Sequence, residues 1–598
     1  MARWLARELY SWLHVLVLQS TVVLSLAALA LPGAQDDVRD EVPLQPGKDL
    51  PLSVQTSAGH LEPRPGGWTR EDLAADVNGA LKEIAHFLEG EGNEASLRAI
   101  ASDSLLSVCW LPARRADAER DLPVDYEVSA QSELAAALGQ DALVAGLVTL
   151  REGFGAGSLD VHFKILGTHG TQESLTTPLR MEVRAAGGAG RTGWVAHIKC
   201  SWTSTESGLQ LTLFELQDYE RTAASAIGFV DRTAAVLPLD MLRDQLRPGI
   251  DSWREQIDAY LGVGVLGHHG LCVADVNQDG LEDIYLCQPG GLPNRLLLRQ
   301  PDGTYRDVSH QAGVDLLDPS SSALLVDLDR DGDPDLVVVV GDELIFMENR
   351  GAGLYRARSR HEAVSVTSIS AADVDLDGDL DLYACAYLSP YDGQAFPVPY
   401  HEAQNGQRNL LLLNDGEFSF KDQTSAMGLD AGNHAFSFAA AWEDFDIDGD
   451  PDLYVANDFG SNNLYRNDGG VFVDVAQAMG VADVGAGMGV DWADVDGDGW
   501  MDLHVSNMFS SAGQRVASQA DFQPQASAAQ RSDLQRHARG NSLFLNQAGQ
   551  GFRDATEQAG VGMGRWAWGG VFMEYDNDGR PDIFVPNGFV TGSGPGDL

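Results

Sequence analysis

The repeat that decides the fold is clearest at residues 373–381, "DVDLDGDLD", where five aspartates alternate with other residues around one glycine. Carboxylates this close repel one another unless water or a cation screens their charge. Side chains at positions 1, 3 and 5 of the pattern D-x-D-x-D-G can converge on one point, and the glycine permits the sharp turn between them. The stretch therefore predicts either a solvated turn or a metal-binding loop.

The same pattern occurs six times from residue 275 onward, each time between two short apolar runs, with copies 46 to 80 residues apart. Solvated turns need no carboxylate at every second position, so the repetition favours metal loops. The last copy begins with glutamate, whose longer side chain makes a solvated turn a stronger alternative there. The candidate ligands at positions 1, 3, 5 and 9 are Asp275, Asn277, Asp279 and Asp283; Asp327, Asp329, Asp331 and Asp335; Asp373, Asp375, Asp377 and Asp381; Asp444, Asp446, Asp448 and Asp452; Asp494, Asp496, Asp498 and Asp502; and Glu574, Asp576, Asp578 and Asp582.

The ligand set also predicts the kind of cation. Oxygen donors that include three or four carboxylates select a hard ion, and a flexible loop suits calcium better than magnesium, which requires a tight octahedron. We therefore expect about five or six bound Ca²⁺ ions. The closing carboxylate stands at position 9 rather than 12, and strands flank the loop, which excludes an EF-hand. Position 7 would add a backbone carbonyl from Leu281, Asp333, Asp379, Asp450, Trp500 and Arg580.

A second phrase recurs between these loops, for example "NLLLLNDGEFSFKDQTSAMGL" (409–429) and "NSLFLNQAGQGFRDATEQAGV" (541–561). It is typical of a strand, a Gly or Asp turn and a second strand. Each full unit then holds about four short strands, which favours propeller blades over a β-helix, whose repeats are much shorter. Insertions near 388–408 and 508–540 are expected to loop out from one face. Because the last unit stops after its second strand, we expect residues 228–236, "GFVDRTAAV", to supply a strand that closes the ring.

The N-terminal third differs from the repeats in composition and periodicity. Residues 1–33 combine Arg3 and Arg7 with an apolar run and a small-x-small site, which predicts a signal peptide. The run also approaches the length of a bilayer span, so an uncleaved N-terminal anchor is the alternative. Residues 34–66 are rich in Pro and Gly without periodicity, as in a linker.

Residues 67–220 combine helical and strand-like patterns, which predicts a smaller α+β domain ahead of the repeats at 221–598. A helix is expected behind Thr69, with Asp72 close to a capping box. Four strand-like runs follow, and this element order resembles the nuclear transport factor 2 and SnoaL-like group. The apolar residues at helical spacing are Leu73, Val77, Leu81, Ile84 and Leu88, and the strand-like runs are 159–167, 178–186, 193–204 and 209–220.

Charge and cysteine content bound the function further. The 40 basic and 88 acidic residues give a formal charge of -48, which argues against nucleic-acid binding. Five scattered cysteines are too few for a disulfide framework. Cys272 and Cys287 could pair across one hairpin, but Cys287 and Cys385 share a repeat position, which favours buried apolar thiols in strands; the remaining two are Cys109 and Cys200.

The acidic loops, together with "NLYRNDGG", "FRDATEQAGV" and "YDNDGRPDIFVPNG", resemble the FG-GAP/VCBS repeat proteins of the cartilage acidic protein and UnbV family over about residues 220–598. The resemblance implies a mainly β fold: an FG-GAP-type β-propeller with seven blades expected, similar to the integrin α-subunit head. It also implies a secreted, calcium-binding protein used for adhesion or partner binding. We find no recognisable UnbV module after the repeats, so no role of that module is expected.

Two classes of function remain open. The first is a secreted or periplasmic binding protein for an extracellular protein or a glycan, with calcium mainly stiffening the hairpins. The second is a polysaccharide lyase or hydrolase built on the same propeller. We find no G-x-S-x-G, H-E-x-x-H or P-loop motif, which favours the binding protein. His268 in "HHG" is the nearest catalytic candidate, and Trp566 and Trp568 in "GRWAWGG" could stack on a sugar or pack between blades.

Overall fold

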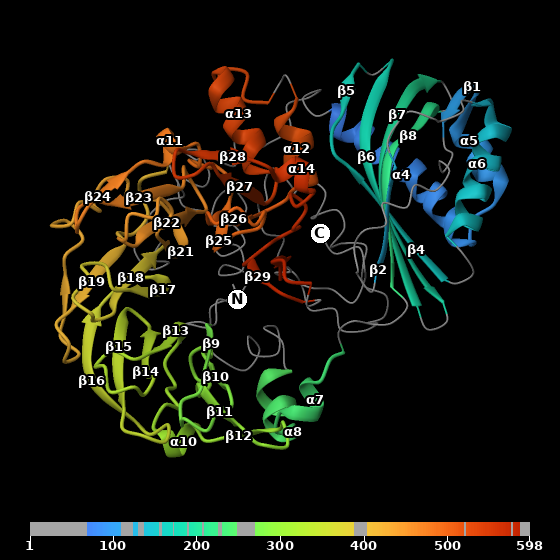
Figure 1. Ribbon diagram of the computed structural model, residues 1–598. Helices are drawn as coiled ribbons and strands as arrows, with labels where there is room; N and C mark the ends of the chain where they lie inside the picture. Colours follow the sequence, from blue (N-terminus) through green and yellow to red (C-terminus); the bar gives the residue numbers. More distant parts are fainter. Residues whose placement is uncertain are drawn as a thin grey trace, which may run out of the picture. The chain divides into compact units, whose positions relative to one another are not determined.

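The computed structural model of the chain (Figure 1) describes residues 69–108, 124–129, 137–154, 158–171, 173–187, 190–205, 208–224, 230–247, 270–387, 403–519, 522–575 and 578–586. The predicted signal segment, the linker, Cys109, His268 and Asp576 lie outside these ranges. The chain divides into two compact units, Met1–Phe229 with Ser510–Arg531, and Val230–Phe509 with Ser532–Leu598. None of the helices in the described ranges has the length and apolar character to cross a bilayer.

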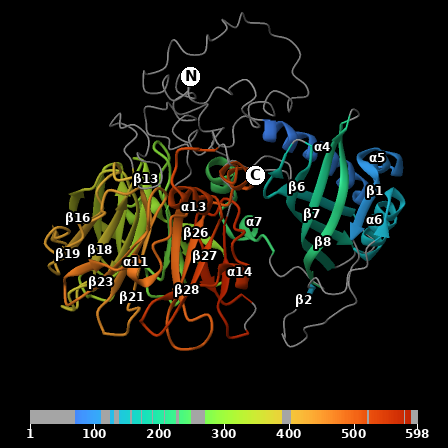
Figure 2. The same cartoon turned by 90° about the horizontal axis from the view of Figure 1, so that it is seen from above.

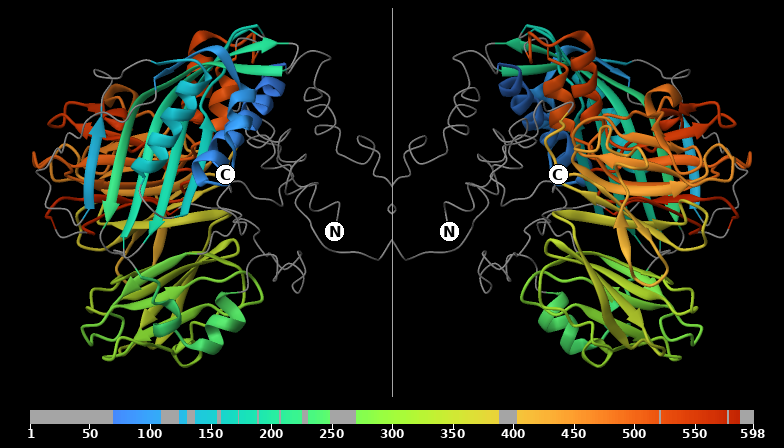
Figure 3. Two further views of the ribbon diagram at one scale, coloured as in Figure 1. Left: turned by 90° about the vertical axis from the view of Figure 1, so that its right-hand side faces the viewer. Right: turned by 90° about the vertical axis from the view of Figure 1, so that its left-hand side faces the viewer.

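The N-terminal unit is an α+β sandwich of helices on a sheet. Its sheet has the order β3-β1-β8-β7-β6-β4, with β2 on β8 and β5 on β6, and helices α4, α5 and α6 lie against one face (Figure 3). The elements are α4 (Thr69–Glu89), α5 (Glu94–Ile100), β1 (Ala101–Val108), β2 (Val124–Ser129), β3 (Ala137–Leu138), α6 (Gln140–Gly153), β4 (Ser158–Ile165), β5 (His169–Gly170), β6 (Leu175–Gly187), β7 (Gly190–Thr205) and β8 (Gly208–Ala224).

The predicted helix and the four predicted strands of this unit are present. Helix α4 buries all five residues that the helical spacing singled out, since Val77, Ile84 and Leu88 are fully inaccessible and Leu73 and Leu81 nearly so. Strands β4, β6, β7 and β8 form the expected antiparallel meander. The parallel pairing of β1 with β8 is not apparent from the sequence. The side chains of Thr69 and Asp72, which carry the capping prediction, lie outside the described part.

The repeat unit consists of short antiparallel sheets, each made from consecutive strands. The first is β9 (Leu271–Ala274), β10 (Asp283–Leu286), β11 (Arg295–Arg299) and β12 (Tyr305–Asp307), followed by α10 (Ser309–Ala312); the second is β13 (Ser320–Val326), β14 (Asp335–Val340), β15 (Glu343–Asn349) and β16 (Tyr355–Glu362); the third is β17 (Val366–Ala372), β18 (Asp381–Ala386), β19 (Leu410–Asn414) and β20 (Phe420–Asp422).

The later sheets repeat this plan, apart from an incomplete last one. The fourth is β21 (Ser437–Glu443), β22 (Asp452–Asn457), β23 (Asn463–Asn467) and β24 (Phe472–Asp474), followed by α11 (Ala476–Met479); the fifth is β25 (Gly487–Ala493), β26 (Asp502–Asn507), β27 (Ser542–Asn546) and β28 (Phe552–Asp554), with α12 (Ser511–Ala517) and α13 (Ala528–His537) before β27 and α14 (Thr556–Ala559) after β28; the sixth is β29 (Val571–Met573) and β30 (Asp582–Phe584).

The first strands of successive sheets pack side by side, so that the sheets follow one another around an arc (Figures 1 and 2). Middle strands such as β14 and β22 are buried on both faces, which explains their continuous apolar runs. We number the repeats 1 to 6 in chain order. Their acidic loops 1 to 6 are residues 275–283, 327–335, 373–381, 444–452, 494–502 and 574–582.

The predicted closing strand at residues 228–236 is wrong. Thr233–Val236 form helix α7, which is followed by α8 (Leu239–Met241) and the π-helical turn η1 (Leu242–Leu246). Asp231 Oδ1 accepts a hydrogen bond of 2.8 Å from the Thr233 amide, a local bond that competes with strand pairing. Within the described ranges, no strand joins the first sheet to the sixth, and no closed ring is present.

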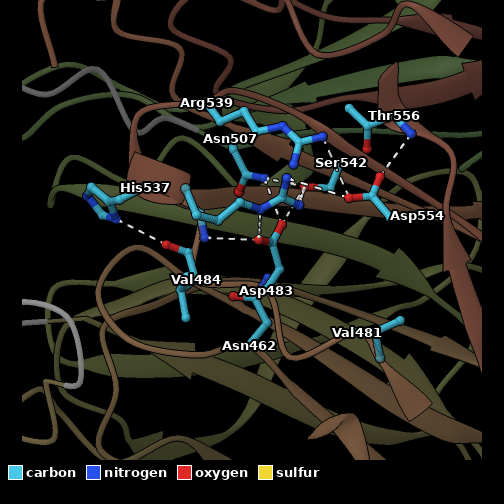
Figure 4. Close-up of polar contacts among 12 residues, drawn as sticks. Asn462, Val481, Asp483, Val484, Asn507, His537, Arg539, Ser542, Asp554 and Thr556 are labelled. Atoms are coloured by element: carbon cyan, nitrogen blue, oxygen red, sulfur yellow. Dashed lines mark hydrogen bonds and ion pairs between the residues drawn. The ribbon is translucent and has the colours of Figure 1, made fainter. Parts of the chain in front are cut away.

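The insertion in repeat 5 is held to the repeat unit by a buried ion pair. Arg536, at the end of α13, lies 2.7 Å from the Asp483 carboxylate, which also accepts from Asn507 and Ser542 (Figure 4). Burial raises the pKa of Asp483, but the charge and hydrogen bond of Arg536 outweigh it and hold that pKa below the ordinary value. Residues 510–531 of the same insertion group with the N-terminal unit.

The four cysteines in the described ranges form no disulfide with one another. Cys200, Cys287 and Cys385 are buried, and Cys272 is partly buried. Burial raises the pKa of the Cys272 and Cys385 thiols to about 12, so these two thiols remain protonated and behave as small apolar side chains. The structure therefore favours the buried-thiol interpretation over a Cys272–Cys287 disulfide.

Candidate metal centres

Each acidic loop spans the turn between the first two strands of its repeat. In loop 4, for example, Asp452 at position 9 pairs with Glu443, the residue just before position 1. Two residues in the turn have left-handed backbone, Ile447 at position 4 (φ 58°) and Gly449 at position 6 (φ 100°). The glycine was predicted from the pattern. The left-handed position 4 was not predicted, because Gln278, Arg330, Leu376 and Ile447 occupy it in loops 1 to 4; Gly497 of loop 5 (φ 77°) was the available signal.

Backbone amides aim the carboxylates at positions 1 and 5. In loop 4 the two oxygens of Asp444 accept from the amides of Asp448 (3.0 Å) and Gly449 (2.9 Å). Asp448 Oδ1 in turn accepts from the amide of Asp450 at position 7, at 3.1 Å. The bond from the position 7 amide to the position 5 carboxylate is also present in the other five loops. The loops are thus ordered by their own hydrogen bonds.

The aspartate at position 9 connects three strands. Asp452 is 1% exposed, its Oδ2 accepts from the position 2 amide of Phe445 at 3.2 Å, and its Oδ1 accepts from Asn467 on the third strand at 2.8 Å. Burial raises the pKa of Asp452 to about 8, although these amide bonds oppose the shift. The same pair of amide bonds holds position 9 of loops 1, 2, 3 and 5, namely Asp283, Asp335, Asp381 and Asp502.

Four groups of three aspartates bring carboxylate oxygens within 4.8 Å of one another and can hold a metal ion. Among these residues, Asp327 Oδ1 and Asp446 Oδ1 are buried without a hydrogen-bond partner. Burial and the nearby carboxylates of Asp448 and Asp444 raise the pKa of Asp446. Orphaned buried oxygens beside like charges fit a hard cation. The groups are Asp327, Asp329 and Asp335; Asp373, Asp375 and Asp377; Asp444, Asp446 and Asp452; and Asp494, Asp496 and Asp502.

Loops 1 and 6 differ from this set. In loop 1, the Asn277 amide is turned toward Asp279, with Nδ2 3.1 Å from Asp279 Oδ2. In loop 6, Glu574 accepts from the Asp578 amide at 2.9 Å, as Asp does at position 1 of loops 1, 3, 4 and 5, but Asp576 lies outside the described residues. The described groups of three close aspartates therefore lie in loops 2 to 5, whereas loop 1 carries an amide in place of the position 3 carboxylate.

Sequence reasoning missed a set of asparagines that join neighbouring repeats. Asn467 at the end of β23 is inaccessible, and its Nδ2 donates to the carbonyl of Val374, at position 2 of the preceding acidic loop, at 3.0 Å. The N-x-x-x-x-N spacing within the second phrase was the available signal. Equivalent bonds join Asn349 to Val276, Asn414 to Leu328, and Asn546 to Phe445.

The other candidates from the sequence pack into the fold. Trp566 is 6% exposed and stacks on Trp568 with ring centroids 6.4 Å apart, and Trp568 meets Phe438 edge to face. This favours the packing interpretation of the two tryptophans over a sugar platform. An open groove of about 740 Å³ lies between α7, α8 and β12, but Arg295 there is already paired with Asp307.

The family comparison matches this geometry. A family model described as "FG-GAP-like repeat" matches residues 275–338, 327–384 and 444–505, each beginning at position 1 of an acidic loop. This chain carries FG-GAP-like repeats. The chain also resembles Cartilage acidic protein 1 of Xenopus tropicalis, with 28% identity over 234 residues. That match covers 37% of this chain and 34% of the relative, so the chain spans about a third of the length of the curated relative it matches.

Solved structures resemble this chain only weakly. A structure of an Agrocybe aegerita lectin, titled for recognition of non-reducing terminal N-acetylglucosamine, has 17% identity, a TM-score of 0.31, and coverage of 54% of this chain and 75% of its own. An NTF2-like protein of unknown function from Pseudomonas putida has 9% identity, a TM-score of 0.17, and coverage of 24% and 84%. At these TM-scores the similarities carry no conclusion about fold or function.

Proposed function

We propose that this FG-GAP repeat protein is a calcium-binding β-propeller that acts outside the cytoplasm as a binding module for a protein or a glycan. The observation that carries the proposal is the set of four aspartate triplets, two of which hold a buried carboxylate oxygen with no partner. Such oxygens are costly unless a cation satisfies them. The proposed calcium ligands are the residues predicted at positions 1, 3, 5, 7 and 9 of loops 1 to 6.

The role proposed for calcium is to lock each hairpin. When bound, the ion offsets the repulsion between the carboxylates and links the two ends of the loop. The chain supplies the rest, because in repeats 1 to 5 the position 9 aspartate already connects the first, second and third strands through its amide bonds, as Asp452 does in loop 4. Stiffened hairpins would present the connecting loops in a fixed arrangement.

The propeller itself is supported by the arc of repeated sheets and by the side-by-side first strands β9, β13, β17, β21, β25 and β29. Six repeats are present, the last of them with two described strands. A full ring needs additional strands beside β29 and β30, since an open sheet edge is exposed otherwise. The proposal of seven blades for the complete ring rests on the resemblance to FG-GAP/VCBS repeat proteins.

A binding module is favoured over an enzyme by the FG-GAP-like repeats, by the similarity to a cartilage acidic protein and by the missing catalytic motifs. The predicted signal segment supports a location outside the cytoplasm, secreted or in the periplasm. Adhesion to an extracellular partner is the form of binding that the resemblance to FG-GAP/VCBS repeat proteins implies.

Calorimetric titration of calcium into the chelator-treated full chain tests the proposal. We expect about five or six ions to bind and the melting temperature to rise markedly. Asp377→Asn should remove one site, whereas Glu362→Gln, an equal charge change on the exposed side of β16, should remove none. Failure to bind calcium stoichiometrically would overturn the proposal. Success would be followed by screening glycans and extracellular proteins with and without calcium.

A further inference from the structure

Side chains at position 4 of two acidic loops reach the next loop. Gln278 in loop 1 donates through Nε2 to the Gly332 carbonyl of loop 2 at 3.0 Å, and also to the Asp333 carboxylate. Arg330 in loop 2 lies 2.8 Å through Nε from Asp379 Oδ1 of loop 3. The acceptors Asp333 and Asp379 both stand at position 7 of their loops.

The direction of each bridging side chain is set by the backbone of its own loop. Gln278 and Arg330 have left-handed backbone, with φ of 58° and 62°. Arg330 stands between Asp329 and Asp331, two candidate ligands of loop 2. An ion that holds those two carboxylates in place therefore also restricts the direction in which the Arg330 side chain extends toward loop 3.

The receiving residue is tied to the candidate ligands of the next loop. The amide of Asp379 donates to Asp377 Oδ1 at 2.9 Å, and its side chain is only 6% exposed. Loss of Arg330 would leave this nearly buried carboxylate without its cationic partner, next to a ligand. An exposed ion pair contributes little, but the burial of Asp379 distinguishes this pair from a surface contact.

We propose that Gln278 and Arg330 are positioning residues that couple acidic loops 1, 2 and 3, so that calcium binding in one loop favours binding in the next. The inference rests on the proposed calcium-binding function. The coupling stops at loop 3, because position 4 of loops 3 and 4 is occupied by Leu376 and Ile447, which have no side-chain donor and are 58% and 59% exposed. Loops 4 and 5 should therefore bind independently.

The sign of the Arg330 effect separates positioning from simple electrostatics. Removal of a positive charge beside loop 3 would by itself raise its affinity for a cation. Loss of the positioning contact would lower that affinity, because Asp379 and the attached Asp377 would no longer be held. We expect Arg330→Gln to lower the affinity of one site about tenfold and to reduce the Hill coefficient of the titration.

The experiment is a calcium titration of the full chain by calorimetry, with a double-mutant cycle. Arg330→Gln is compared with Arg356→Gln, an equal charge change at an exposed position on the same sheet. In a background of Asp373→Asn, which disables loop 3, Arg330→Gln should change the remaining affinities less than twofold. Arg330→Lys should recover part of the lost affinity, because the cationic partner of Asp379 returns.

The outcomes separate this inference from the proposed function. If the unaltered chain binds no calcium, the proposed function and the coupling between loops are both wrong. If it binds calcium, but Arg330→Gln matches Arg356→Gln or raises the affinity, the coupling is overturned and the calcium site stands. Should Arg330→Gln fail to fold, Asp379→Asn removes the same contact from the other side and should produce the same loss of affinity and cooperativity.

Discussion

The side-chain amide of Asn467 donates 3.0 Å to the carbonyl of Val374, which lies 93 residues earlier in the preceding acidic loop. The same Asn467 nitrogen reaches the Pro451 carbonyl at 3.3 Å, and its Oδ1 accepts from the Gly470 amide at 2.7 Å. One inaccessible side chain therefore satisfies backbone groups of two repeats. Where such an asparagine recurs, each acidic loop is fastened to the repeat that follows it.

Asn467→Ala should destabilise the repeat unit by about 2 kcal/mol or more, because buried carbonyl groups lose their donor. Urea unfolding in excess chelator measures the change, which keeps any effect of calcium out of the comparison. Arg356→Ala, at an exposed position, is the control and should change the free energy of unfolding by less than about 0.5 kcal/mol. Equal stability of the two variants would contradict the fastening role.

In the absence of calcium, mutation of two aspartates of loop 4 should affect the free energy of unfolding differently. Asp452→Ala leaves two buried amides unpaired, so it should cost about 2–5 kcal/mol. Asp446 lies beside Asp444 and Asp448, and its Oδ1 has no hydrogen-bond partner. Asp446→Asn removes a charge that these neighbours repel, so the free energy of unfolding in chelator should not fall. With calcium added, Asp446→Asn should instead lose part of the rise in melting temperature. A matching loss for both variants in chelator would show that the position 3 carboxylate stabilises the metal-free loop.

Asp458 predicts a pH-dependent stability outside the acidic loops. It is 1% exposed, and burial raises its pKa to about 7, opposed by the hydrogen bond of 2.6 Å that the Tyr387 hydroxyl donates to it. Because the folded pKa exceeds the unfolded one, the folded state retains a proton that the unfolded chain has lost between about pH 4 and 7. The contribution of this group to stability therefore falls across that range and is lowest above pH 7.

Asp458→Asn should remove this dependence. At pH 8 the variant should be more stable than the unaltered protein, by on the order of 3 kcal/mol, and the difference should shrink toward pH 4. Urea unfolding of both proteins between pH 5 and 8 tests this. A difference that stays constant with pH would mean that Asp458 does not take up a proton in this range.

The pair of Asp483 and Arg536 should behave as one unit. The Asp483 side chain is inaccessible and that of Arg536 is 15% exposed. Removing either partner therefore leaves a buried charge without its counter-ion. Asp483→Ala and Arg536→Ala should each cost about 3–5 kcal/mol, and the double variant much less than the sum. Chemical unfolding of the three variants gives the coupling energy. Additive effects would show that the two side chains act separately.

Ile447 offers a stabilising substitution. This β-branched residue has left-handed backbone, φ 58°, and is 59% exposed, so it gains little from burial and carries a steric cost. Ile447→Asn should raise the free energy of unfolding by about 1 kcal/mol, because asparagine tolerates this conformation. Leu354→Asn, which is 52% exposed outside the left-handed region, should give no gain. A loss of stability at Ile447 would show that its side chain has a role in the loop.

The sequence predicts the acidic loops well because their information is local. Spacing alone places Asp444, Asp446 and Asp448 around one turn, and six copies remove the ambiguity of a single match. The burial of Asp452 is less accessible to such reasoning, since one of its two amide partners lies on a third strand. That contact depends on how the strands pair rather than on the loop itself.

The contacts that the sequence did not predict depend on residues that lie far apart along the chain or on local hydrogen bonds. The asparagine bonds join residues of different repeats, and no local pattern specifies the partner of Asn467. Residues 228–236 share apolar and aspartate positions with the second phrase, but the hydrogen bond from the Thr233 amide to Asp231 favours a helical turn. The bridge from Arg330 to Asp379 likewise needs two neighbouring loops in place before it can be recognised.

The consecutive order of strands within each sheet has a consequence for how the chain folds. Contacts between neighbours in sequence form fast, so repeats 1, 2 and 4 can assemble from strands that follow one another closely along the chain. Repeats 3 and 5 differ, because long insertions separate β18 from β19 and β26 from β27, and closing these segments carries an additional entropic cost. These two pairings should therefore be the slow steps of folding, each completed after the neighbouring short hairpins have formed.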